Sequence, residues 1–89
     1  MLASSEATMT LPDGVALHAR PAALFVRTAM RFQAKIVVSA NGRDADAKSI
    51  LSVLGLGATA GTTLLVRADG DDAAEALGAL ADLLASVVE

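Results

Sequence analysis

The chain has 89 residues and a mass of 9.0 kDa, which is enough for one small domain and leaves no length for a second. It contains no cysteine, which excludes a disulfide scaffold and a thiolate metal site and fits a reducing compartment. The net charge is −3, and the seven basic residues are spread along the chain. They do not form the basic surface that a nucleic-acid partner requires.

Two segments bear on targeting and membrane insertion. Residues 1–10 have neither a basic n-region nor an apolar h-region, so they do not predict a signal peptide. Residues 49–66 are uncharged and approach the length of a membrane-spanning helix. This stretch contains Gly55, Gly57 and Gly61, and it therefore predicts a short helix, a glycine loop and a buried strand rather than insertion into a membrane.

In the first half of the chain, the spacing of apolar residues predicts a strand, a helix and a second strand. Residues 6–11 alternate between polar and apolar side chains, with Ala7, Met9 and Leu11 on one face. Pro12-Asp13-Gly14 ends this strand. A helix is predicted over residues 19–31, and a strand over residues 35–40 that directs Ile36, Val38 and Ala40 to one side. The buried face of the helix is expected to consist of Ala22, Phe25, Val26, Ala29 and Met30.

The middle of the chain predicts a hairpin followed by a short helix. Asn41-Gly42 is typical of a type I′ turn, because both residues tolerate a positive φ. Residues 43–47 are then the third strand, in which Asp44 and Asp46 face water. Residues 50–54 predict a short helix, with Ser49 as its N-cap and Gly55 as its stop.

The last third predicts a fourth strand over residues 62–68, a turn at Asp69-Gly70-Asp71 and a final helix. Asp72 is expected to cap this helix together with Glu75, three residues later. The buried stripe of the helix is expected to be Leu77, Leu80, Ala81, Leu84 and Val87. The element order predicts an α+β fold with one sheet, helices on one of its faces and the other face open to solvent.

His18 is the only histidine, and it stands where a loop becomes a helix. Pro21 is tolerated only in the first helical turn, so the helix begins close to His18. The N–H groups of Ala19 and Arg20 then have no partner within the helix. These amides, the helix dipole and the Arg20 guanidinium favour an anion, above all a phosphoryl group carried by His18. A neutral imidazole is a competent nucleophile toward an activated phosphoryl donor.

Two segments resemble a known family. Leu17-His18-Ala19-Arg20-Pro21-Ala22-Ala23 resembles the active-site motif of HPr, the histidine phosphocarrier of the bacterial phosphoenolpyruvate:sugar phosphotransferase system. A second block runs from Gly42-Arg43 to Lys48-Ser49-Ile50-Leu51-Ser52-Val53-Leu54-Gly55-Leu56-Gly57 and resembles the regulatory-serine segment of that family. The family usually has Gly two residues before the histidine, where this chain has Ala16, and often a small hydrogen-bonding residue at the position of Val15. This loop is therefore expected to lack one phosphate-stabilising side chain.

The resemblance implies an open-faced β-sandwich with a four-stranded antiparallel sheet. It also implies that Nδ1 of His18 receives a phosphoryl group from phosphorylated enzyme I and passes it to IIA domains of sugar permeases, with Arg20 neutralising the phosphate. A monomeric cytoplasmic carrier without cofactor or metal is expected, not a catalyst with turnover of its own. Ser49 is implied as a site for a regulatory kinase, with helix N-capping as its alternative role. The implied partner-docking residues are Ala23, Leu24, Arg27, Ile50, Leu51 and Leu54.

Two other functions are alternatives to the phosphocarrier. A regulatory module of the same fold would act by contact with transcription factors or enzymes, but such relatives tend to lack the histidine. A small-molecule sensor would need a ligand pocket, for which the sequence shows no residues. The acidic cluster Asp69, Asp71 and Asp72 lacks the spacing of a calcium loop and is expected to be a solvated turn. The glycines of residues 55–61 are not a phosphate loop, because no Lys-Ser/Thr follows them.

Overall fold

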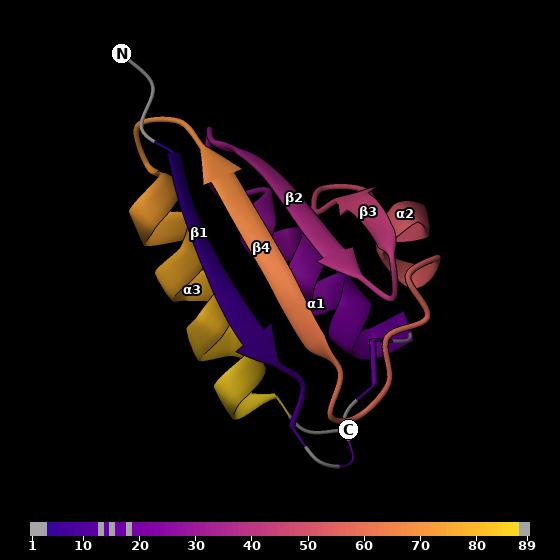
Figure 1. The fold of residues 1–89 in the computed structure, drawn as a ribbon. Helices are drawn as coiled ribbons and strands as arrows, with labels where there is room; N and C mark the ends of the chain where they lie inside the picture. The colour runs from indigo at the N-terminus through magenta and orange to yellow at the C-terminus, as the bar shows by residue number, and fades with distance from the viewer. Residues whose placement is uncertain (1–3, 13, 15, 18, 88–89) are drawn as a thin grey trace.

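The computed structural model describes residues 4–12, 14, 16–17 and 19–87. The candidate phosphoryl acceptor His18 lies outside the described residues, as do Asp13 and Val15. Strands and helices follow one another in the predicted order (Figure 1). Their bounds are β1 Ser4–Thr10, α1 Ala19–Ala29, β2 Lys35–Ala40, β3 Arg43–Asp46, α2 Ile50–Leu54, β4 Thr63–Asp69 and α3 Ala73–Ser86.

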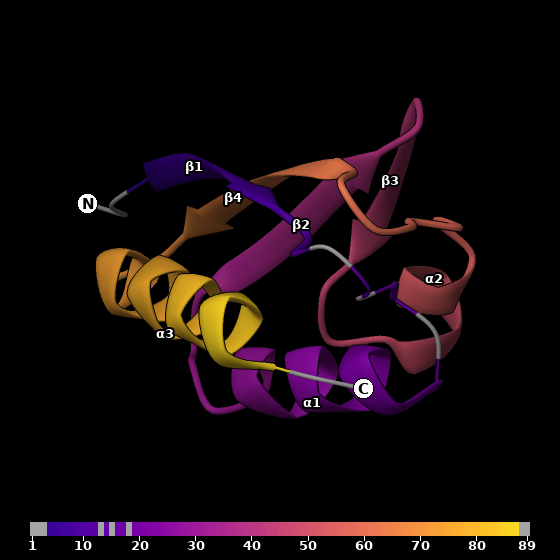
Figure 2. The ribbon, with the colours of Figure 1, turned by 90° about the horizontal axis from the view of Figure 1, so that it is seen from below.

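The four strands form one antiparallel sheet in the order β1-β4-β2-β3, so the first and last strands of the chain are neighbours. The helices lie on one face of this sheet, and none of the described elements covers the opposite face (Figures 1 and 2). Helix α1 packs against both α2 and α3, while α3 also contacts β1 and β4. This arrangement confirms the predicted α+β fold with an open sheet face.

The core lies between the sheet and the helices, and it follows from alternation in the strands. Ile36 and Val38 of β2 and Leu64 and Val66 of β4 are fully buried, whereas the residues between them are half-buried or exposed. Phe25 of α1 is the largest of the fully buried side chains. Burial of apolar area contributes about 25 cal/mol per Å², so this layer supplies most of the stabilisation of the described fold.

The limits of β2 were predicted correctly, whereas those of β1, β3 and β4 differ from the expected ones by one or two residues. Strand pairing, and not side-chain alternation alone, decides where these strands end. The β1–β4 register runs from Ser4 opposite Asp69 to Thr10 opposite Thr63, so both strands extend beyond the limits set by side-chain alternation. Leu11, predicted as the last residue of β1, follows the strand and donates its amide to the Thr62 carbonyl. Strand β3 ends at Asp46, one residue before the predicted limit.

Two expectations about the long helices are wrong. Helix α1 ends at Ala29 instead of Arg31, because Arg31 and Phe32 donate to carbonyls three residues back in tighter turns. Met30, expected in the core, is consequently 64% exposed. In α3, Ala81 is exposed, while Ala73 and Ala76 are buried instead. The stripe of Leu77, Leu80 and Leu84 was predicted correctly, and Ala81 lies at its edge.

The hairpin and the short helix were predicted correctly. Asn41 and Gly42 both have a positive φ, 55° and 75°, as the type I′ turn requires. Helix α2 spans the predicted residues and begins after Ser49, although Gly55 ends it with right-handed geometry. None of the helices in the part of the chain that the structure describes is both long and apolar enough to cross a bilayer.

Candidate functional site

The first turn of α1 provides the described part of the candidate phosphate site. The helix begins at Ala19, the residue directly after His18 in the sequence, and Pro21 is buried within the first turn. Ala19 and Arg20 are both exposed. Amides in a first helical turn have no carbonyl partner within the helix, and they carry the positive end of its dipole. The first turn therefore has free amides and one exposed arginine in the residues that directly follow His18 in the sequence.

Ser49 has the structural role that the sequence predicts. Its backbone is extended, and its hydroxyl oxygen accepts a hydrogen bond from the Ser52 amide at 3.4 Å. The Ser49 carbonyl accepts the first backbone hydrogen bond of the helix from Val53 at 3.0 Å. An N-cap of this kind stabilises a helix by about 1 kcal/mol. The half-buried Ser49 side chain thus lies at the beginning of the short helix α2.

The proposed docking residues lie on two neighbouring helices. On α1, Ala23 and Arg27 are exposed and Leu24 is half-buried. Helix α2 packs beside the beginning of α1 (Figure 2). It exposes 37% of Ile50 and 80% of Leu51. Its last residue, Leu54, is half-buried and packs against the core, so Leu54 contributes less surface than Ile50 and Leu51.

The loop from α2 to β4 holds the backbone on the N-terminal side of α1. The Leu17 amide donates to the Ala58 carbonyl at 2.9 Å, and the Gly61 amide donates to the Leu11 carbonyl at 3.0 Å. Leu17 and Ala58 are both buried. Sequence analysis identified this loop only by its glycines. Its contact with Leu17 is made between backbone atoms, so the side-chain pattern contains no signal for it.

The acidic turn after β4 is a structural clamp, and its role differs from the prediction. Asp72 precedes α3, but its carboxylate makes no hydrogen bond to the amides of that helix. It accepts the amides of Gln33 and Ala34 instead, at 2.8 and 2.9 Å, and so ties α3 to the segment between α1 and β2. The Gln33 amide, ahead of the Ala34 amide, lowers the pKa of Asp72, and partial desolvation opposes this effect.

An open depression of about 610 Å³ lies beside this clamp. Its wall combines the cation of Lys35 with the carboxylates of Asp69, Asp71, Asp72 and Glu75. Across the described ranges, no group of three or more His, Cys, Asp or Glu side chains is arranged to hold a metal ion. Asp69 and Asp71 are exposed at this turn, while the half-buried Asp72 forms the clamp.

Comparison with known proteins identifies the family. The family model described as the PTS HPr component phosphorylation site matches residues 5–86. The phosphocarrier protein HPr of Xylella fastidiosa is 41% identical over 78 residues, which is 88% of each chain. The crystal structure of HPr-C-His from Thermoanaerobacter tengcongensis is 43% identical, with a TM-score of 0.88 over 92% of both chains.

A crystal structure of an HPr dimer from the same organism is also similar, with 43% identity and a TM-score of 0.74 over 92% of this chain and 94% of that one. The family match covers both motifs of the sequence analysis, the start of α1 and the Ser49 segment. The chain belongs to the HPr family, the phosphocarriers of the phosphotransferase system.

Proposed function

We propose that His18 accepts a phosphoryl group from phosphorylated enzyme I and donates it to IIA domains of sugar permeases. The lone pair of Nδ1 forms the new bond to phosphorus as the bond from phosphorus to enzyme I breaks. The second transfer reverses this exchange toward the IIA acceptor, and the imidazole returns to its starting form. The observation that carries the proposal is the family match over residues 5–86, combined with the start of α1 at Ala19, directly after His18.

The first turn of α1 supports this role electrostatically. Phosphoryl transfer needs positioning and stabilisation of charge on the phosphoryl oxygens more than it needs covalent chemistry from the protein. The amides of Ala19 and Arg20 and the helix dipole supply partial positive charge at this point. The exposed Arg20 guanidinium adds a full charge and donors that fit phosphate oxygens. No cofactor or metal enters this scheme.

Docking of both partners is assigned to Ala23, Leu24, Arg27, Ile50, Leu51 and Leu54. Leu51, which is 80% exposed, is the central apolar contact of this set. Helix α1 contains two arginines, Arg20 and Arg27, and no acidic residue. This combination of apolar and positive surface suits an acidic partner face with an apolar centre.

Incubation with phosphoenolpyruvate and enzyme I, followed by intact mass measurement, tests the acceptor. We expect an acid-labile gain of one phosphate in the wild type and none in His18→Ala. An acid-stable phosphate, or an equal gain in His18→Ala, would contradict the assignment. Partner binding without any phosphoryl gain would instead identify the chain as a regulatory module that acts by contact.

Ser49 is proposed as a second phosphorylation site, used by a dedicated kinase to weaken docking. A phosphate there adds up to about two negative charges at the beginning of α2, next to the docking residues Ile50 and Leu51. These charges repel an acidic partner face. We expect Ser49→Asp to accept phosphate from enzyme I more slowly than the wild type, and Ser49→Ala to transfer at nearly the wild-type rate. Equal rates for Ser49→Asp and the wild type would refute this regulation.

The carrier is further proposed to act as a cytoplasmic monomer, since it must dock briefly with one partner after another. Sedimentation equilibrium of the full chain tests the monomer against a dimer such as that of the Thermoanaerobacter tengcongensis protein. A dimer at micromolar concentration would contradict this part of the proposal.

A further inference from the structure

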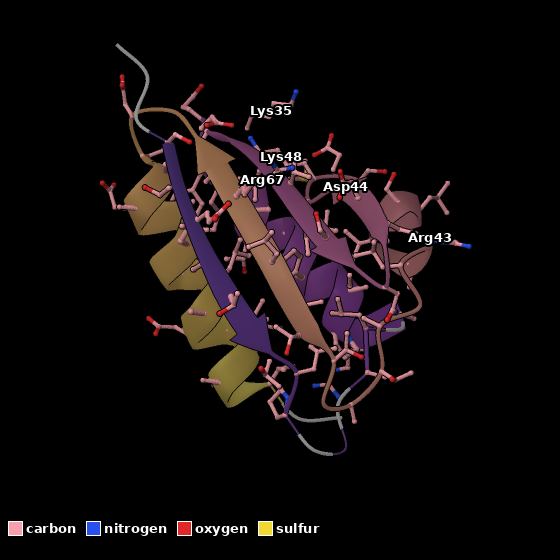
Figure 3. All side chains as sticks on the ribbon, viewed as in Figure 1. Lys35, Arg43, Asp44, Lys48 and Arg67 are labelled. Carbon is pink, nitrogen blue, oxygen red and sulfur yellow. The ribbon has the colours of Figure 1, made fainter. Side chains whose placement is uncertain are left out.

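The tip of the β2–β3 hairpin is tied to the end of α2 by two side chains. Asn41 donates from Nδ2 to the Leu56 carbonyl, and Arg43 donates from Nη1 to the Gly55 carbonyl, both at 3.1 Å. Gly55 is the C-cap of α2 and Leu56 follows it, so these two donors bind carbonyls just beyond the helix. The carbonyls of Leu51, Val53 and Leu54 accept the amides of residues 55–57. Figure 3 shows Arg43 at the side of the sheet where α2 lies.

The tied segment leads directly to the candidate site. Leu56 and Ala58 are both buried, and Gly57 between them has a φ of 65°. The Ala58 carbonyl accepts the Leu17 amide at 2.9 Å. Leu17 immediately precedes His18 in the sequence. Residues 56–58 therefore link the hairpin tip to the backbone next to the phosphoryl acceptor.

Strand pairing and turn geometry fix the conformation of the hairpin from which this link starts. Strand β2 is paired on both sides, with β4 and with β3. Asn41 and Gly42 fit the type I′ turn because both have a positive φ. A side chain that extends from this turn thus has a defined origin, and its hydrogen bond fixes the position of the accepting carbonyl.

We propose that Asn41 and Arg43 are positioning residues: they hold residues 55–58 so that the Ala58 carbonyl fixes Leu17, and thereby the entry to α1. The relevance of this brace to phosphoryl transfer rests on the proposed function of His18. The brace is the set of contacts from Asn41 and Arg43 through residues 55–58 to Leu17. Its existence does not depend on the proposed function, because it concerns only the mobility of the Leu17 backbone. Neither residue contacts the transferred group in this scheme, so their effect is indirect.

Amide hydrogen exchange at Leu17 tests the brace itself. Asn41→Gly and Asn41→Asp both remove the Nδ2 donor and keep a residue that tolerates positive φ. In the full-length chain, we expect Leu17 to exchange about fivefold faster in either variant, and faster still when Arg43→Ala is added. The Leu11 amide, bonded to Thr62 at the other end of the loop, is expected to change less than twofold.

Ser39→Ala is the matched control in the same hairpin. It removes the hydrogen bond from Ser39 to Asp44, which joins β2 to β3 without involving α2. Leu17 exchange in this variant is expected to stay within twofold of the wild type. Equal acceleration at Leu11 and Leu17, or the same acceleration in Ser39→Ala as in the Asn41 variants, would reduce the effect to general destabilisation and overturn the proposal.

Kinetics then tests the consequence for transfer. With enzyme I at saturation, we expect Asn41→Asp with Arg43→Ala to lower the rate of phosphoryl transfer severalfold with little change in KM. A positioning fault at His18 lowers the rate of the step itself, whereas damaged docking raises KM. An unchanged rate alongside faster Leu17 exchange would refute the link to transfer. Failure of the wild type to accept phosphate would refute the proposed function and leave the exchange test of the brace valid.

Discussion

The loop before β4 and the turn after β4 both depend on glycine, but they use it differently. In the turn, a Cβ on Gly70 would lie 2.8 Å from the Cα of Ala34. The Asp72 carboxylate binds the same segment by accepting hydrogen bonds from the Gln33 and Ala34 amides. In the loop, Gly57 and Gly61 have positive φ, and a Cβ on either would meet nothing within 4 Å. The backbone contact between Gly70 and Ala34 is closely packed, whereas the loop before β4 is shaped by backbone conformation with space around its glycines.

Substitution of Gly70 is expected to give the largest effect. Gly70→Ala forces a side chain against the backbone of Ala34 and places it at a φ of 148°. Overpacking of this kind costs about 1–3 kcal/mol, and the backbone strain adds to it. Urea unfolding measures the loss. Gly78→Ala is the control: Gly78 lies inside α3 with open space around its Cα, and alanine there is expected to stabilise by about 0.5–1 kcal/mol.

Gly61→Ala measures the free-energy cost of a positive φ separately from any steric clash. At a φ of 80°, an L-residue costs about 1–2 kcal/mol, and the free space leaves no further penalty. The same urea experiment is expected to place this variant between the wild type and Gly70→Ala. If Gly61→Ala were as unstable as Gly70→Ala, the loop would be packed as tightly as the turn and the comparison would fail.

Comparison of Asp72→Asn with the wild type is expected to show a pH-dependent contribution of the Asp72 clamp to the free energy of unfolding. The folded state lowers the pKa of Asp72, chiefly through the Gln33 amide, so the ionised carboxylate stabilises the fold. This contribution is complete above the unfolded pKa of about 3.9 and is lost as the pH falls through the lower folded pKa. The difference in free energy of unfolding between wild type and Asp72→Asn should therefore be largest near neutral pH and shrink below about pH 4. A difference that stays constant from pH 7 to pH 3 would show that the carboxylate charge contributes nothing.

Leu51→Ser is expected to have the smallest effect on stability and a clear effect on docking. Because Leu51 is 80% exposed, its replacement should change the free energy of unfolding by no more than about 0.5 kcal/mol. Loss of an apolar interface contact of about 1 kcal/mol should raise the KM for enzyme I about fivefold. Ala85→Ser, on the exposed side of α3, is the control for both measurements. An unchanged KM would remove Leu51 from the docking surface.

Side-chain patterns predicted the architecture well, because alternation and helical spacing record which side chains are buried. They identified the buried face of β2 and the hairpin at Asn41-Gly42. They failed where backbone atoms or long-range partners decide the structure. Asp72 fits the pattern of an N-cap, yet it binds Gln33 and Ala34, which are distant in the sequence. Met30 fits the helical stripe, yet α1 ends one residue before it.

At the candidate site, the sequence indicated where α1 and α2 begin, and the structure adds the hydrogen bonds that hold the backbone around them. The start of α1 at Ala19 was predictable from Pro21, and the N-cap at Ser49 from its residue type. Two kinds of hydrogen bond could not be predicted: the backbone bond between Leu17 and Ala58, and the side-chain bonds from Asn41 and Arg43. In each, the acceptor is a backbone carbonyl, which every residue carries.

The pairing of β1 with β4 has a consequence for how the chain folds during synthesis. Ser4 lies opposite Asp69, so β1 cannot pair with β4, its neighbour among the described strands, until the long segment between them has been translated. Contacts of such high sequence separation slow folding, because the entropy of closing a long loop is lost before any pairing compensates for it. The apolar side chains of β1 must therefore wait without their partner strand until β4 has been translated.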